Sequence, residues 1–308
     1  MTNSKNMKTL CNGFDLKTLK RQLSYLLIAC AAGVFANSAN ATDDPTLAKI
    51  ERTGEIVIGH RANARPFSFV NKQSEPQGYS IDLCKEIAGT VQSKLGLSEL
   101  NIKYREINPS NHVGLVEVGE VDIVCGATSQ TFKRMERVGF SILTFVSGSA
   151  ALLNENAEVR SPSDLDGKRI GVRLDSTTDR ATTAGVARRN MTTDIVRYKT
   201  HLEGLRALER KEISVYLADR ILLISLAEQA AEPEKIRLSD RFFTYEPYAL
   251  MLRRDALDFG LIVNRTLAEL YRTRKIVDIY RKWFEVFGDR LDEFQLRAMY
   301  RLQSIPEG

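Results

Sequence analysis

The chain has 308 residues, with 44 lysines and arginines against 39 aspartates and glutamates, which gives a formal net charge of +5 at pH 7. Five of the basic residues and one acidic residue fall within residues 1–41, so the rest of the chain carries 39 basic against 38 acidic residues. A nearly neutral protein lacks the basic surface that nucleic-acid binding requires, and we expect no nucleic-acid partner.

The amino terminus predicts a signal peptide over residues 1–41. Basic residues precede an apolar and small-residue run over 23–36, and Ala39-Asn40-Ala41 forms a small-x-small cleavage site. The run has about 14 residues, whereas a helix needs about 20 to cross a bilayer core. A second interpretation takes residues 27–30 (LIAC) as a lipoprotein box that leaves lipidated Cys30 first. We therefore expect a periplasmic protein, with a lipid-anchored form as the alternative.

Short apolar runs alternate with helical patterns through the rest of the chain. A helical face over 80–95 ends at Gly96, a long amphipathic helical stretch covers 257–287, and a polar terminal helix follows residue 291. The alternation predicts an α/β protein with parallel sheets covered by helices. The expected buried strands lie at 55–60, 121–125, 168–172 and 213–217.

Two extended segments, 144–153 and 245–252, do not follow this alternation of strands and helices, and each predicts a single strand. If both cross between lobes, the block between them is a second lobe inserted into the first. We expect a two-lobed fold whose two hinge strands permit closure about a ligand. The expected boundaries are lobe 1 over 42–146 and 250–308, and lobe 2 over 147–249.

Cys84 and Cys125 are the cysteines that remain after residues 1–41 are removed. An even pair in an oxidising compartment permits a disulfide. We favour two separate buried thiols, because each cysteine lies in an apolar stretch. The sequence contains no CxxC, HExxH or other metal-ligand spacing, so we expect neither a metal ion nor a cofactor.

Polar residues follow the predicted strands, at the edge where parallel α/β sheets bind ligands. Arg61 follows strand 55–60, and an arginine there either pairs with a carboxylate or lies in a solvated loop. Thr128 and Ser129 follow strand 121–125, and Arg134 comes about one turn into the next element. This segment forms either a carboxylate cradle or an ordinary helix cap.

The second half of the chain offers similar positions. Thr177 and Thr178 open a helix after strand 168–172, and Asp219 follows strand 213–217, where each residue could cap a helix or contact a ligand. Thr200 and Glu203 form a capping box that places His201 at the first helical position. A protonated histidine is unfavourable there, so either an anionic ligand or a neutral surface histidine explains it.

These candidates place cationic and hydroxyl donors from both lobes opposite one carboxylate, Asp219. That set complements an α-amino acid with additional negative charge. We identify no nucleophile–base pair and no nucleophile elbow such as GxSxG, so we expect a binding protein and not an enzyme. We also expect it to be a monomer.

The segments TLAKIERTGEIVIGHRANARPFSF, GYSIDLCKEI, VGEVDIVCGATSQTFKR, SDLDGKRIGV and IYRKWF occur in that order. The chain resembles the amino-acid-binding proteins of bacterial ABC transporters (solute-binding protein family 3) over most of residues 45–287. Within that family it is most similar to the glutamate/aspartate-binding proteins. The resemblance implies the type II periplasmic-binding-protein fold and an ABC permease as partner.

The resemblance also implies a role for each candidate. Arg134, with Thr128 and Ser129, matches the element that holds the ligand α-carboxylate, and Asp219 matches the acceptor of the α-ammonium. The residues that match contacts to the acidic ends of the ligand are Arg61, Thr177, Thr178 and His201.

Several positions depart from the glutamate/aspartate-binding pattern. Pro109 and His112 stand where those proteins carry a serine and an arginine, Ala127 replaces a serine, and Ser176 replaces a glycine. His112 can still donate one hydrogen bond, but a fixed positive charge is lost. A neutral polar amino acid or another dicarboxylate is therefore an alternative ligand. A periplasmic enzyme similar to cyclohexadienyl dehydratases and a ligand-sensing module are the alternative functions.

Overall fold

The computed structural model describes residues 44–154, 157–285 and 293–307. The predicted signal peptide over 1–41, including the alternative lipidation site at Cys30, lies outside the described residues. Within the described part of the chain, the helices are too short or too polar to cross a membrane.

The first sheet has the strand order β5-β1-β6-β13-β7. Strand β1 (Glu55–His60) lies between β5 (Asn101–Glu106) and β6 (Ile123–Cys125), and both pair with it in parallel. Strand β13 (Glu246–Arg253) pairs antiparallel with β6 and with β7 (Val138–Ser147). The strand predicted over 55–60 is therefore present, at the centre of the parallel part of the sheet.

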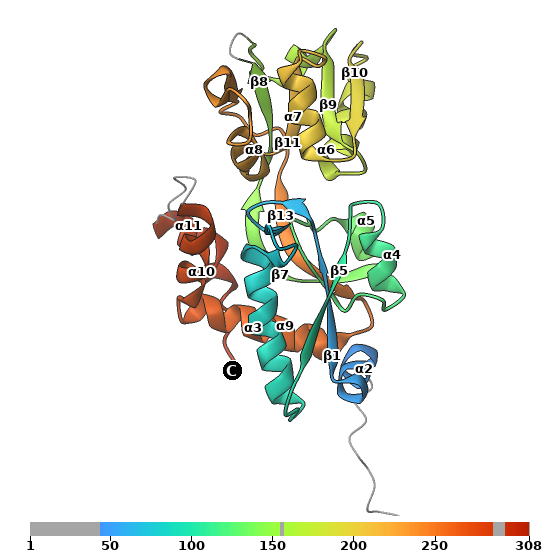
Figure 1. Ribbon diagram of the computed structural model, residues 1–308, viewed down its shortest axis with the longest axis vertical. Helices are drawn as coiled ribbons and strands as arrows, with labels where there is room; N and C mark the ends of the chain where they lie inside the picture. The colour runs from blue at the N-terminus through green and yellow to red at the C-terminus, as the bar shows by residue number, and fades with distance from the viewer. Residues whose placement is uncertain (1–43, 155–156, 286–292, 308) are drawn as a thin grey trace, which may run out of the picture. The chain divides into compact units, whose positions relative to one another are not determined.

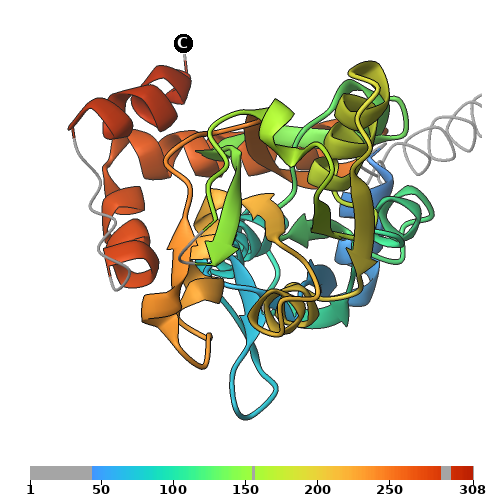
Figure 2. The ribbon, with the colours of Figure 1, turned by 90° about the horizontal axis from the view of Figure 1, so that it is seen from above.

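Helices flank this sheet in Figure 1, and a small three-stranded sheet lies beside it. The small sheet is formed by β2 (Asn63–Ala64), β3 (Ser68–Val70) and β4 (Pro76–Gln77). Figure 2 shows the C-terminal helices (red) on the opposite side from the first described helix (blue). The helices are α2 (Pro45–Thr53), α3 (Tyr79–Lys94), α4 (His112–Glu117), α5 (Phe132–Met135), α9 (Leu257–Arg272), α10 (Lys275–Phe284) and α11 (Glu293–Met299).

The second sheet has the order β10-β9-β11-β8-β12. Strand β9 (Arg169–Arg173) pairs in parallel with β10 (Asp194–Tyr198) and β11 (Val215–Asp219). Strand β8 (Ser149–Asn154) lies antiparallel between β11 and β12 (Ile236–Leu238). The helices of this lobe are α6 (Thr177–Arg188), α7 (His201–Glu209) and α8 (Arg220–Ala227). The two mixed α/β sheets confirm the predicted two-lobed α/β fold.

The chain changes sheets at Gly148, between β7 and β8. The single strand predicted over 144–153 is therefore wrong, because two strands in different sheets occupy that segment. A Cβ at Gly148 would lie 2.5 Å from the Thr244 carbonyl oxygen, so the close approach of the returning chain requires glycine here. The return occurs between β12 and β13, and the predicted boundary at residue 249 falls inside β13.

The helical stretch predicted as continuous over 257–287 is divided into α9 and α10. Arg274, between them, has a φ of +64°, a left-handed conformation that ends one helix and starts the next in a new direction. The terminal helix α11 is not simply polar, because Leu296 and Met299 are buried in the core of the first lobe. The Tyr300 side chain follows them and contacts the Tyr79 hydroxyl at 3.0 Å.

Cys84 and Cys125 form a disulfide, so the expectation of two separate thiols is wrong. Cys84 lies on the buried face of α3 and Cys125 ends β6, which α3 covers, with 6.4 Å between the two Cα atoms. The apolar surroundings of each cysteine are the shared core of one lobe. The bond therefore ties a covering helix to the sheet at the edge where the strands end.

Candidate functional site

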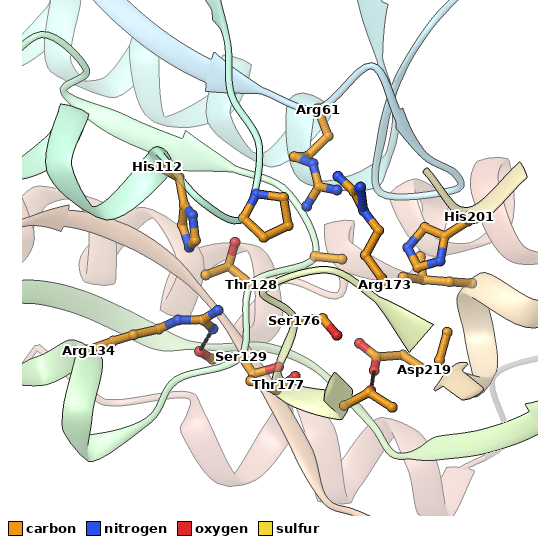
Figure 3. Close-up of a pocket in the computed structure, with 15 residues that line it drawn as sticks. Arg61, His112, Thr128, Ser129, Arg134, Arg173, Ser176, Thr177, His201 and Asp219 are labelled. Carbon is orange, nitrogen blue, oxygen red and sulfur yellow. Dashed lines mark hydrogen bonds between the residues drawn. The ribbon is translucent and has the colours of Figure 1, made fainter. Parts of the chain in front are cut away.

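One pocket contains every residue predicted for the site. Its lining also includes Pro109, Ala127, Arg173 and Ser176, which were not among the predicted ligand contacts. Figure 3 shows the side chains converging from both lobes on a common space. The predicted residues that line it are Arg61, His112, Thr128, Ser129, Arg134, Thr177, Thr178, His201 and Asp219.

The pocket lies at the carboxyl ends of the parallel strands. Arg61 directly follows β1, and Thr128 lies three residues beyond the end of β6. Arg173 and Asp219 are the last residues of β9 and β11, which neighbour each other in the second sheet. Strand ends and the starts of the following helices meet at such an edge, and this is why α/β sheets bind ligands there.

Arg134 is held in place by its own neighbours. One guanidinium nitrogen donates to the Ser129 carbonyl oxygen at 2.6 Å, and the Thr131 hydroxyl caps the short helix α5 that carries it. Burial lowers the pKa of Arg134 to about 10, which leaves it fully charged at neutral pH. The remaining N–H groups give the pocket an oriented cation.

Asp219 occupies the N-cap position of α8 but does not cap the helix with its side chain. Its carboxylate accepts hydrogen bonds from the Thr178 hydroxyl at 3.2 Å and from the Tyr248 hydroxyl. Burial, and then repulsion from the Glu246 carboxylate, raise the pKa of Asp219 to about 7. The carboxylate is therefore poised to ionise fully when a cation approaches it.

Glu246, at the start of β13, is a buried carboxylate that the sequence analysis did not single out. It accepts from Thr177 Oγ1 at 2.8 Å, from Thr244 Oγ1 at 2.8 Å, and from the Ser129 hydroxyl. Ser129 belongs to the first lobe and Thr177 to the second. Glu246 thus links both lobes to the strand on which the chain returns to the first sheet.

The threonines at the start of α6 use their hydroxyls within the protein. Thr177 donates to Glu246 and Thr178 to Asp219. What they offer a ligand is their backbone: the first-turn N–H groups of a helix have no intrahelical acceptor and favour an anion. Ser176 caps the same helix through the Asp179 amide.

The two pocket histidines are neutral. Burial and nearby arginines lower the pKa of His112 and of His201 to about 3. The predicted capping box at Thr200 is present and starts α7 at His201, but the ring is buried, which excludes a surface histidine.

The Tyr216 hydroxyl lies 3.0 Å from Nδ1 of His201. The hydroxyl can donate to Nδ1, which leaves Nε2 protonated as a donor toward the pocket. Gly204 makes this arrangement possible, because a Cβ there would lie 2.1 Å from the Tyr216 ring. In that tautomer, the second lobe presents His201 as an oriented neutral donor.

Two arginines whose guanidinium groups have no acceptor among the described residues complete the pocket. Arg61 is 9% exposed and Arg173 is 6% exposed, and Figure 3 shows their guanidinium groups directed to the same end of the pocket. Burial, and then repulsion from Arg173, lower the pKa of Arg61 to about 9. Arg173 was missed in the sequence, although a charged residue that closes a buried strand at its carboxyl end was a usable signal.

The described residues contain no cluster of histidine, cysteine, aspartate and glutamate able to hold a metal ion. The pocket is instead lined by the buried Arg61 and Arg173, the half-buried Arg134, the buried carboxylate of Asp219, hydroxyls and neutral imidazoles. The buried Glu246 carboxylate lies next to it, hydrogen-bonded to Ser129 and Thr177 of the lining. A set of this kind binds by charge and hydrogen bonds.

Two lobes with strand ends facing a shared polar pocket define a ligand-binding protein. The sequence model of the bacterial extracellular solute-binding proteins, family 3, matches residues 56–286, and the chain belongs to this family. The resemblance found in the sequence is thereby confirmed. So is the expectation of a binding protein rather than an enzyme, because the family and the relatives below are solute-binding proteins.

Similar proteins include two curated relatives and a solved structure of the same fold. The L-glutamate/L-aspartate-binding protein of Pseudomonas aeruginosa is 31% identical over 240 residues, which cover 78% of this chain and 80% of that protein. The glutamate/aspartate import solute-binding protein of Escherichia coli is 28% identical over 267 residues, covering 86% and 88%. The solute receptor for L-cysteine of Neisseria gonorrhoeae superposes with a TM-score of 0.70 at 19% identity, covering 81% and 98%, a likeness of fold alone.

Proposed function

We propose that this protein captures an acidic amino acid, glutamate or aspartate, and delivers it to an ABC permease. The observation that carries the proposal is the charge of the pocket. The guanidinium groups of Arg61, Arg173 and the half-buried Arg134 line the pocket, and the two histidines in it are neutral. The opposing carboxylates are Asp219 in the lining and Glu246, which is hydrogen-bonded to the lining residues Ser129 and Thr177. The excess of one positive charge complements a ligand with one net negative charge, which an acidic amino acid carries at neutral pH.

The geometry supports one orientation of the ligand. The α-carboxylate lies against Arg134, Thr128 and the amides at the start of α6, and the α-ammonium donates to Asp219. The side-chain carboxylate points to the end of the pocket that holds Arg61 and His201. In this orientation each charged group of the ligand meets an opposite charge or a hydrogen-bond donor.

Closure of the lobes supports the role in delivery. Asp219 of the second lobe accepts from Tyr248 of the first, and Ser110 of the first donates to Asp175 of the second at 2.5 Å. Contacts of this kind can form only when the lobes are together, so a ligand that bridges the lobes favours the closed state. A permease would recognise that state at the periplasmic surface of the membrane, where the predicted signal peptide directs the protein.

Thermal denaturation of the purified protein in the presence of each common amino acid tests the proposal. A ligand at about 100 times its Kd should add about 2.7 kcal/mol to the free energy of unfolding. We expect glutamate or aspartate to raise the Tm by more than glutamine does at the same concentration. A shift with a neutral amino acid, and none with either acid, would contradict the acidic assignment and leave only the binding role.

Arg134→Ala tests the placement of the α-carboxylate. Loss of a charge-assisted hydrogen bond should weaken binding by at least about 1.5 kcal/mol, about tenfold. Arg137→Ala is the matched control, because Arg137 is exposed and pairs with Glu117 outside the pocket. Equal affinities for the two variants would place the α-carboxylate elsewhere.

A further inference from the structure

Among the described residues, no hydrogen bond or ion pair of its side chain explains why Arg173 is buried. Its Nε has no hydrogen-bond partner, and its guanidinium forms no ion pair within residues 44–154, 157–285 and 293–307. The two acidic side chains whose charges raise the pKa of Arg173 accept their hydrogen bonds from other groups. Glu203 accepts from the Lys199 and Thr200 amides, and Asp175 accepts from Ser110.

A second arginine shares the same end of the pocket. The Arg61 guanidinium also forms no hydrogen bond or ion pair with the described residues, although its backbone amide donates to Ser68. Repulsion from Arg173 lowers the pKa of Arg61, and both arginines lower the pKa of His201. Buried charges are ordinarily paired, so two adjacent buried cations without an acceptor are an incomplete arrangement.

The pair comes from opposite lobes. Arg61 follows β1 in the first sheet, and Arg173 ends β9 in the second. An anion held by both guanidinium groups would complete their hydrogen bonds and draw the lobes together at this end of the pocket. Planar guanidinium groups suit a carboxylate, whose two oxygens accept paired N–H bonds.

We propose that Arg173 and Arg61 together bind the side-chain carboxylate of the ligand, and that Arg173 is the residue by which this protein distinguishes an acidic amino acid from its amide. The inference rests on the proposed function. His201 donates to the same carboxylate from Nε2, and Arg134 at the opposite end remains the partner of the α-carboxylate.

Arg173→Met removes the charge while keeping most of the side-chain volume, and isothermal titration with L-glutamate and L-glutamine measures the consequence. We expect the affinity for glutamate to fall by about ten- to a hundredfold. The affinity for glutamine should change by less than about threefold, because an amide side chain places no negative charge between the arginines. Arg173→Lys should recover part of the glutamate affinity, since it restores the charge without the planar fork.

Arg169→Met is the matched control. Arg169 lies on the same strand, is exposed and pairs with Asp194. Its substitution should leave both affinities unchanged. The melting temperature of the ligand-free protein adds a second readout: a structural arginine would lower the Tm when removed, whereas an unpaired buried cation should leave the Tm equal or higher.

Each outcome is decisive. If Arg173→Met weakens glutamate and glutamine equally, or weakens neither, the side-chain subsite is wrong while the acidic assignment stands. A lowered Tm of the ligand-free variant with unchanged discrimination would make Arg173 a structural residue. If the unaltered protein binds neither glutamate nor aspartate, the proposed function fails and this inference fails with it.

Discussion

Capture of an amino acid should release a proton from Asp219. In the free protein, burial and then repulsion from Glu246 raise the pKa of this carboxyl to about 7. A ligand ammonium within hydrogen-bond distance favours the ionised carboxylate, so the complex holds Asp219 without its proton. Protons and ligand therefore compete for one group, and the affinity must fall as the pH falls through 7.

The pKa of about 7 for Asp219 in the free protein sets the size of this pH effect on the Kd. At pH 6 about nine-tenths of the free protein carries the proton and must lose it on binding, which weakens the Kd about tenfold, or ~1.4 kcal/mol, relative to pH 8. His112 and His201 do not obscure the effect, because their pKa values of about 3 lie well below this window.

Calorimetric titration in two buffers of different ionisation enthalpy counts the protons. We expect about 0.9 proton released at pH 6 and about 0.1 at pH 8. Asp219→Asn should abolish the pH dependence along with most of the affinity. Asp255→Asn, at an exposed carboxylate paired with Arg253, should preserve both. A Kd that is equal at pH 6 and pH 8, with no proton released, would refute the assignment of the ammonium to Asp219.

Two further changes test the scaffold. Cys84 and Cys125 are 41 residues apart, so reduction of their disulfide should lower the free energy of unfolding by about 4 kcal/mol through the entropy of the opened loop. Urea denaturation with and without reductant measures this loss of stability. An unchanged urea midpoint would contradict the prediction. Gly204→Ala should cost about 1–3 kcal/mol through collision with Tyr216 and should weaken ligand binding by displacing His201. Gly89→Ala, on an exposed helical face with open space, should be neutral or stabilising, and equal urea midpoints for the two variants would contradict the packing argument.

The main elements could be predicted because buried parallel strands and amphipathic helices leave a local pattern. The same pattern marks strand ends, so Arg61, Thr128 and Asp219 could be named as pocket candidates before the fold was known. Their ligand roles stay predictions until binding is measured. The capping box at Thr200 and Glu203 could also be predicted, since it depends on neighbouring residues alone.

Features that depend on distant residues could not be predicted. Glu246 meets Thr177 and Ser129, which lie 69 and 117 residues away, and nothing near Glu246 in the sequence indicates either contact. The pairing of Cys84 with Cys125 likewise depends on how α3 covers β6.

The loss of a fixed charge at His112 argued against an acidic ligand, and the burial of Arg173 in the pocket removes much of that objection. The sequence alone could not show this, because the two positions lie in different lobes. The charge balance of the pocket becomes visible only when both lobes are considered together.

The central claim is that both carboxylates of an acidic amino acid are held in this pocket, one at each end. A crystal structure of the protein with L-glutamate tests it most directly. We predict the α-carboxylate on Arg134, the ammonium on Asp219 and the side-chain carboxylate between Arg61 and Arg173. A glutamate bound in the reverse orientation, or an empty pocket at saturating glutamate, would contradict the account.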